Sequence, residues 1–281
     1  MIKKGFLANG EMLGWEPEKL MSFIKETGYD AVELIADVIF AGGKDGKSFR
    51  DAADKYGVII SEILAQHDYV LKDANERKNS IELTKEHIKK SAEMGVNVVN
   101  LFTGPVPWVE YPVRVGANIS MTDAWNYVFD AFDEVLPVAE KEGVKIAVEN
   151  VWGMLVHDFY TNQFLINHYN CDNLGVNLDP SHDILYGNND ASFIVKSWGK
   201  KIFHVHIKDA VGVAGGGKFV FPLIGEGNVD FGAFFAALEQ IGYDGCASVE
   251  FESWAYRKNI LGGSHAAAAK MCLDAVNQFI K

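Results

Sequence analysis

The sequence predicts one α/β domain over residues 1–281, a single (β/α)8 barrel of the TIM-barrel class. Short apolar runs alternate with amphipathic stretches along the whole chain, which is typical of parallel βαβ units. Each kind of segment occurs eight times. Four of the later apolar runs end in a possible metal ligand, and barrels of this class carry their chemistry at the carboxyl ends of the strands.

The predicted strands are apolar, β-branched runs at 5–10, 31–36, 58–65, 97–103, 144–150, 174–180, 202–209 and 246–252. The predicted helices lie at 17–27, 48–56, 75–94, 121–142, 161–168, 190–199, 230–241 and 263–280. Several helices end at a glycine, because glycine readily adopts the left-handed conformation that follows a helix C-terminus. These glycines are Gly28, Gly57, Gly95, Gly143 and Gly242. Asp190 and Asp230 precede other helices as expected N-caps.

Composition excludes several classes of partner. The formal net charge is −12 at pH 7, and an acidic chain is repelled by phosphate backbones, so we expect no nucleic-acid partner. No run approaches the roughly 18 apolar residues of a membrane span, and the N-terminus lacks the apolar core of a signal peptide. The three cysteines form no CxxC motif and are expected to be core residues. We therefore expect a cytoplasmic protein with no membrane partner.

The possible metal ligands fall near the ends of the runs VKIAVEN, LGVNLDP, IFHVHIKD and CASVEFE. They are Glu149, Asp179, His206 and Glu250. Ligands at the carboxyl ends of successive barrel strands converge on one point. A set of three carboxylates and one imidazole, without a thiolate, suits Mn²⁺, Mg²⁺, Fe²⁺ or Co²⁺ better than a structural zinc site.

Strand alternation predicts which of these side chains face the barrel interior. In the run 202–209, His204, His206 and Lys208 share one face and apolar residues share the other. Buried polar groups are costly unless they are paired or bound to metal, so this polar face indicates a site. In the last run, alternation points both Glu250 and Glu252 inward and does not decide which is the ligand. Asp179, taken alone, is more typical of a helix cap or turn residue than of a metal ligand.

Other polar and aromatic residues keep two interpretations. Glu33 and Glu62 occupy corresponding places on the second and third strands, where they either bind substrate hydroxyls or pair with lysine or arginine. Aromatic residues near strand ends either stack on a sugar ring or fill the core; they are Trp15, Phe102, Trp108, Trp152 and Trp254. The longest irregular segment, 210–229, contains three consecutive glycines and is either a lid over the site or a surface excursion.

The chain resembles the sugar phosphate isomerase/epimerase superfamily of xylose isomerase-like barrels, which also contains metal-dependent apurinic endonucleases. The segments that carry the resemblance are KIAVEN, NLDPSHDILYG, IFHVHIKDA and IGEGNVDFGAFFAALEQIGYDGCASVEFE. The resemblance implies that one divalent metal, Mn²⁺ foremost and Mg²⁺, Co²⁺, Fe²⁺ or Zn²⁺ otherwise, is bound by Glu149, Asp179, His206 and Glu250. It also selects Glu250 over Glu252. The acidic charge disfavours the endonuclease branch.

The resemblance further implies a sugar isomerase or epimerase that removes a proton beside a carbonyl, through an enediolate, with Glu149 and Glu250 as the catalytic groups. The substrate is then a sugar, keto-sugar or inosose, and we expect it to be bound by His182, Lys208, Trp152 and His157. A lyase on the same site stays open, either an inosose-type dehydratase or a 3-oxo-C-glycoside deglycosidase with a small accessory subunit. A third interpretation is that the protein is a non-catalytic sugar-binding subunit. We expect a homo-oligomer.

Overall fold

The computed structural model describes residues 1–280, which fold around a closed barrel of parallel strands. The barrel strands are β1 (Lys3–Leu7), β2 (Ala31–Ile35), β3 (Ile59–Leu64), β4 (Val98–Leu101), β5 (Lys145–Glu149), β6 (Leu174–Leu178), β7 (Ile202–Ile207) and β10 (Cys246–Val249). Their order around the barrel is β1-β10-β7-β6-β5-β4-β3-β2, and each neighbouring pair is parallel. The predicted (β/α)8 fold class is confirmed.

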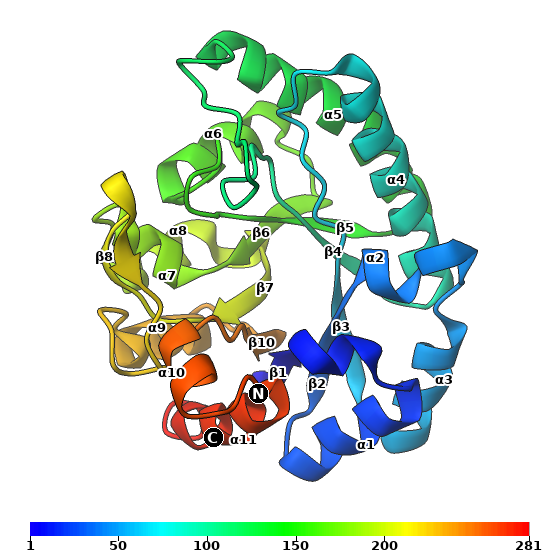
Figure 1. Cartoon of the computed structure of the whole chain (residues 1–281), viewed down its shortest axis with the longest axis vertical. Coiled ribbons are helices and arrows are strands. Elements are labelled where there is room, and N and C mark those ends of the chain that lie inside the picture. Colours follow the sequence, from blue (N-terminus) through cyan, green and yellow to red (C-terminus); the bar gives the residue numbers. More distant parts are fainter. Residues whose placement is uncertain (281) are drawn as a thin grey trace.

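Helices surround the strands, as Figure 1 shows. The major helices are α1 (Pro17–Thr27), α3 (Lys47–Tyr56), α4 (Ala74–Glu93), α5 (Met121–Glu142), α6 (Phe159–Tyr169), α8 (Ala191–Trp198), α9 (Phe231–Gln240) and α11 (His265–Val276). Each corresponds to a predicted helix. Gly28 and Gly143 follow α1 and α5 with φ of 108° and 68°, the left-handed conformation that the sequence predicts at these helix ends.

Apolar and polar strand residues separate onto the two faces of the barrel. Phe6, Val176 and Val205 are completely buried in the hydrophobic core. Completely buried polar side chains, among them Glu62 and Asn100, contact one another across the barrel interior. The barrel therefore has a polar interior beneath its carboxyl-terminal end, and this polar interior supports the site described below.

Three short α-helices and a hairpin follow the carboxyl ends of strands, and the sequence analysis did not predict them. They are α2 (Ala36–Ile39) after β2, α7 (Pro180–Leu185) after β6, a hairpin after β7 and α10 (Trp254–Asn259) after β10. The hairpin pairs β8 (Val211–Val213) with β9 (Lys218–Val220), so the segment 210–229 is more ordered than expected. All four are shorter than the window over which periodicity identifies an element.

The fold bears on two expectations from composition, which concern membrane-spanning helices and the cysteines. Among the residues that the structure describes, no helix has both the length and the apolar character needed to cross a membrane. The cysteines Cys171, Cys246 and Cys272 are free thiols; Cys272 is buried as expected, whereas Cys171 and Cys246 are only half-buried.

Candidate metal centre and substrate cavity

The four predicted metal ligands meet at the carboxyl end of the barrel. Glu149 is the last residue of β5, His206 lies in β7, and Asp179 and Glu250 each follow the last residue of their strand. One ligand atom from each lies within 4.8 Å of those of the other three. Glu149, Asp179 and His206 are buried, and the Glu250 side chain is 15% exposed. Four strands thus place an oxygen-rich ligand set at one point.

The imidazole of His206 is oriented toward this cluster. Its Nδ1 lies 3.1 Å from Oε1 of Glu149 and 3.3 Å from Oε2 of Glu250. Its Nε2 lies 3.0 Å from Oε2 of Glu33 on β2. Histidines that bind metal commonly donate the other ring N–H to a carboxylate, which fixes the ring orientation. Glu33 supplies that partner.

Asp179 caps a helix and also lies in the ligand cluster. As the N-cap of α7 it accepts hydrogen bonds through Oδ1 from the backbone N–H and the hydroxyl of Ser181. Its Oδ2 is buried and accepts no well-oriented hydrogen bond. The ammonium of Lys208 lies 2.9 Å from this oxygen and neutralises one charge of the cluster. Three largely buried carboxylates, with ligand atoms within 4.8 Å of one another, carry more negative charge than one lysine balances, so the four residues fit a divalent metal ion.

Lys208 lies among these carboxylates. Its Nζ is 2.9 Å from Asp179 Oδ2, 2.5 Å from Glu250 Oε2 and 3.2 Å from Glu252 Oε2. Burial lowers the pKa of Lys208, but the carboxylates outweigh burial and hold this pKa well above its usual value. Lys208 is therefore a permanent ammonium group beside the ligand cluster.

The two proposed catalytic glutamates lie in opposite environments. Burial raises the pKa of Glu149, and His206 only partly offsets this effect. Burial also raises the pKa of Glu250, but Lys208 and His206 outweigh it and bring this pKa below its usual value. Pairs of titratable groups with pKa values shifted in opposite directions are typical of acid–base sites.

Two residues that sequence reasoning missed hold the Glu149 carboxylate. Asn100 Nδ2 on β4 and Gln66 Nε2 after β3 each donate to Oε2 of Glu149 at 3.0 Å. Asn100 Nδ2 also contacts Glu62 Oε1 at 3.2 Å. An asparagine inside the apolar run VVNL was the signal that could have revealed this contact.

Glu33 and Glu62 follow neither interpretation suggested by the sequence. Both are completely buried below the ligand cluster, and they pair with histidines rather than with lysine or arginine. His204 Nε2 lies 3.1 Å from Glu33 Oε1, and His204 Nδ1 lies 3.1 Å from Asn177 Oδ1. These groups support the site from the barrel interior.

A cavity of about 730 Å³ opens above the cluster. Its polar lining includes Glu149, His182, Lys208, Glu250 and Glu252. Most of the expected aromatic residues also border it, together with two from the segment 210–229: Phe102, Trp108, Trp152, Phe219, Phe221 and Trp254. Trp15 does not line this cavity but packs edge-on against Phe23, with ring centroids 5.3 Å apart. The volume and mixed lining are typical of a small-molecule site.

The hairpin formed by β8 and β9 supplies part of the cavity wall. Phe219 has its ring centroid 4.9 Å from that of Trp152, and Phe221 packs edge-on at 5.6 Å from His182. Part of the segment 210–229 therefore lines the cavity, which makes this segment more than a surface excursion.

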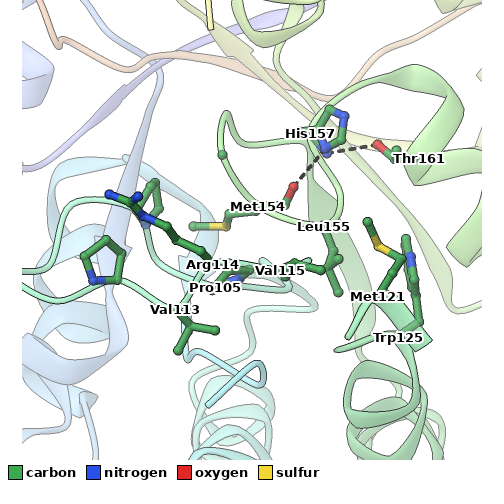
Figure 2. A pocket seen from close by; sticks show the side chains of 13 residues that line it. Pro105, Val113, Arg114, Val115, Met121, Trp125, Met154, Leu155, His157 and Thr161 are labelled. Atoms are coloured by element: carbon green, nitrogen blue, oxygen red, sulfur yellow. Dashed lines mark hydrogen bonds between the residues drawn. The ribbon is translucent and has the colours of Figure 1, made fainter. Parts of the chain in front are cut away.

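The residues expected to bind substrate are divided between two pockets. His182 and Trp152 border the large cavity, where the Trp152 backbone N–H donates to Nδ1 of His182 at 3.3 Å. His157 instead lines a neighbouring pocket of about 440 Å³, shown in Figure 2. There its Nδ1 lies 2.8 Å from the Met154 carbonyl oxygen, and its ring packs 4.2 Å from that of Tyr186.

The profile of the family described as "Xylose isomerase-like TIM barrel" matches residues 21–270 of the chain. The chain belongs to this family. An inosose isomerase from Bacillus velezensis is 33% identical over 240 residues, which cover 82% of this chain and 81% of the relative. An inosose dehydratase from Clostridium perfringens is 24% identical over 157 residues, covering 51% and 52% of the two chains.

Solved structures have the same fold. The 3-keto-D-glucoside 4-epimerase YcjR from E. coli matches with a TM-score of 0.79 and 17% identity, over 99% of this chain and 100% of that one. The IolI protein with a bound zinc atom matches with a TM-score of 0.73 and 22% identity over the whole of both chains. These characterised relatives and neighbours include sugar epimerases, an inosose isomerase and an inosose dehydratase, in agreement with the expectation of an enzyme.

Proposed function

We propose that the protein is a divalent-metal-dependent isomerase or epimerase acting on an inosose or a related keto-sugar. The observation that carries this proposal is the meeting of Glu149 and Glu250 with Asp179 and His206 at the base of the large cavity. The relationship to the inosose isomerase of Bacillus velezensis supports the substrate class. A cyclic polyol ketone offers a carbonyl next to a C–H bond, which is the arrangement that two positioned carboxylates can act on.

In this proposal, Glu149, Asp179, His206 and Glu250 hold the ion. A divalent ion bound there would polarise a substrate carbonyl and so acidify the neighbouring C–H bond. Mn²⁺ is the ion we propose, because three carboxylates and one imidazole form an oxygen-rich set. Mg²⁺, Co²⁺, Fe²⁺ and Zn²⁺ are the alternatives to be compared with it.

Proton transfer is assigned to the two glutamates. One carboxylate takes the proton from the carbon beside the carbonyl, which gives an enediolate. The other glutamate starts in its protonated form and donates its proton to the opposite face of that carbon, which inverts it. Alternatively it donates to the neighbouring carbon while the hydroxyl proton passes between the two enediolate oxygens, which moves the carbonyl. Gln66 and Asn100 orient Glu149 through their hydrogen bonds.

Lys208 and His182 are proposed to bind the substrate oxygens. Lys208 remains charged beside the carboxylates and can donate to a hydroxyl or carbonyl oxygen at the cavity floor. Burial, together with Lys208, lowers the pKa of His182 to about 3, so its imidazole is neutral at physiological pH. Trp152 is proposed as an apolar wall for the sugar ring, and His157 as a more distant contact from the neighbouring pocket.

A dehydratase on the same site is the second candidate, supported by the inosose dehydratase of Clostridium perfringens. Elimination begins with the same proton abstraction and also needs an acid that protonates the departing hydroxyl, which leaves as water. Burial raises the pKa of Glu252 to about 7, partly offset by Lys208, so Glu252 can carry a proton near neutral pH. Its position on the cavity wall suits that role.

The test is incubation of the Mn²⁺-loaded protein with a panel of inososes and ketoses in deuterated water. An isomerase or epimerase places deuterium on carbon in the recovered sugar and its isomer. A dehydratase gives an unsaturated product instead. Absence of exchange and of product across the whole panel would contradict an enzyme of either kind.

A further inference from the structure

A second group of possible metal ligands lies apart from the large cavity. Asp37 is in the short helix α2, His67 follows β3, and His87 is on α4. One ligand atom from each lies within 4.8 Å of those of the other two. None of the three is among the residues that line the cavity above Glu149. Three separate elements thus bring two imidazoles and a carboxylate together at the barrel rim.

Hydrogen bonding within this group joins the two imidazoles and does not involve the carboxylate of Asp37. Nε2 of His67 and Nδ1 of His87 lie 3.1 Å apart and share one hydrogen bond, which an ion bound through either nitrogen would replace. Nε2 of His87 faces Oδ1 of Asp37 at 4.0 Å, which is too long for a hydrogen bond. Two zinc–ligand bonds of about 2.0–2.2 Å at a tetrahedral angle hold their ligand atoms roughly 3.3–3.6 Å apart, so this gap must shorten when an ion binds. Rotation of the exposed Asp37 side chain can supply that movement.

Burial favours the ligand form of both imidazoles. His67 and His87 are 9% and 4% exposed, whereas the Asp37 side chain is 60% exposed. Burial lowers the pKa of His67, and burial together with His67 lowers the pKa of His87 to about 4. Both rings are therefore neutral at physiological pH, which is the form that binds metal. The exposed Asp37 side chain makes the cluster accessible to ions from solvent.

We propose that Asp37, His67 and His87 form a second metal site, which takes a divalent transition ion such as Zn²⁺. Two imidazoles and one carboxylate leave a fourth position for water in a tetrahedral site. This donor set favours Zn²⁺, Co²⁺ or Ni²⁺, whereas the oxygen-rich cluster of the barrel favours Mn²⁺ or Mg²⁺. The two sites therefore prefer different ions.

An ion at this second site would tie α2, the end of β3 and α4 together. His67 directly follows Gln66, whose Nε2 donates to the Glu149 carboxylate at 3.0 Å. The second site thus stiffens the segment that holds a proposed catalytic group, without touching the substrate cavity.

The experiment is zinc binding by equilibrium dialysis of the chelator-treated full chain, followed by metal analysis and thermal unfolding. We expect two equivalents of zinc in the parent, and one in Asp37→Asn and in His87→Gln. His206→Ala should keep the second-site ion, and the double variant with Asp37→Asn should lose it. Zinc should also raise the unfolding temperature of His206→Ala, since a ligand that binds the folded state stabilises it. His168→Gln, an exposed histidine on α6, is the matched control and should retain two equivalents.

Two results would overturn the proposal. One is a His206→Ala protein that binds no zinc, because only the second site remains in that variant. The other is a second equivalent that persists in Asp37→Asn, which would remove Asp37 from the ligand set. Asp37 is exposed, so its variant remains informative even where His87→Gln does not fold.

Discussion

Nε2 of His206 lies 3.0 Å from Oε2 of Glu33, while Nδ1 of the same ring faces Glu149 and Glu250. The strand β2 therefore controls the orientation of a residue proposed as a metal ligand on β7. This contact crosses the barrel interior and involves a glutamate outside the ligand cluster.

Glu33→Gln is expected to weaken metal binding about 10–100-fold, the usual effect of losing a group that orients a ligand histidine. Titration with Mn²⁺ measures it. Glu62→Gln is the matched control, because Glu62 lies in the same barrel layer but contacts His204 and Asn100 rather than His206. Equal affinities in the two variants would show that Glu33 does not orient His206.

Glu149→Gln and Glu250→Gln are expected to abolish turnover more than they weaken sugar binding. An amide keeps the shape and one metal-binding oxygen but cannot accept a proton, and a positioned base contributes about 100- to 10,000-fold in rate. Steady-state kinetics, with metal content measured in parallel, separates the two effects. If Glu250→Gln stays active with metal bound and Glu252→Gln is inactive, the two glutamates exchange roles.

His182→Ala is expected to keep its metal and to raise KM, lower kcat, or both. Nε2 of His182 lies 3.0 Å from Nζ of Lys208, and its ring borders the cavity. Metal analysis together with kinetics on the best substrate checks this. Loss of metal in His182→Ala would assign the residue to the ligand cluster instead.

The ionised carboxylate of Glu11 is expected to stabilise the folded state at neutral pH and to lose this effect in acid. Burial raises its pKa, but hydrogen bonds from the backbone N–H groups of His265 and Ala266 and from Ser264 outweigh burial and lower the pKa to about 2. Because the folded-state pKa lies below the ordinary value of 4.5, the stabilisation is complete above pH 4.5 and is lost as the pH falls toward 2.

Glu11→Gln should therefore cost about 0.3–1 kcal/mol of unfolding free energy at pH 7, since this carboxylate at the N-terminus of α11 is partly exposed and screened by solvent. Denaturant unfolding at several pH values measures the difference from the parent. Glu16→Gln is the control, because Glu16 makes no capping hydrogen bond. A difference that grows as the pH falls would have the wrong sign.

The barrel and the ligand cluster could be predicted because their signals are local and periodic. Alternation within IFHVHIKD places His204 and His206 inside, and their burial in the structure agrees. Alternation could not decide between Glu250 and Glu252, since both share one face. The structure includes Glu250 in the ligand cluster, while Glu252 contacts Lys208.

Long-range contacts and short elements could not be predicted from periodicity. Gln66 is unremarkable in sequence, and only the closed barrel brings it and Asn100 to Glu149. The hairpin of β8 and β9 is too short and too rich in glycine for its pattern to identify it. His157 falls in a neighbouring pocket because the loop after β5 turns back on itself, with the Val151 N–H donating to the Val156 carbonyl at 3.0 Å.

The central claim is that Glu149, Asp179, His206 and Glu250 bind one divalent ion, and manganese content after chelation and reloading tests it most directly. Mn²⁺ is the appropriate probe, because the site formed by Asp37, His67 and His87 favours other ions. We expect about one Mn²⁺ per parent chain and almost none in His206→Ala or Asp179→Ala, with unchanged content in His168→Gln. Near-stoichiometric manganese in both His206→Ala and Asp179→Ala would contradict the account.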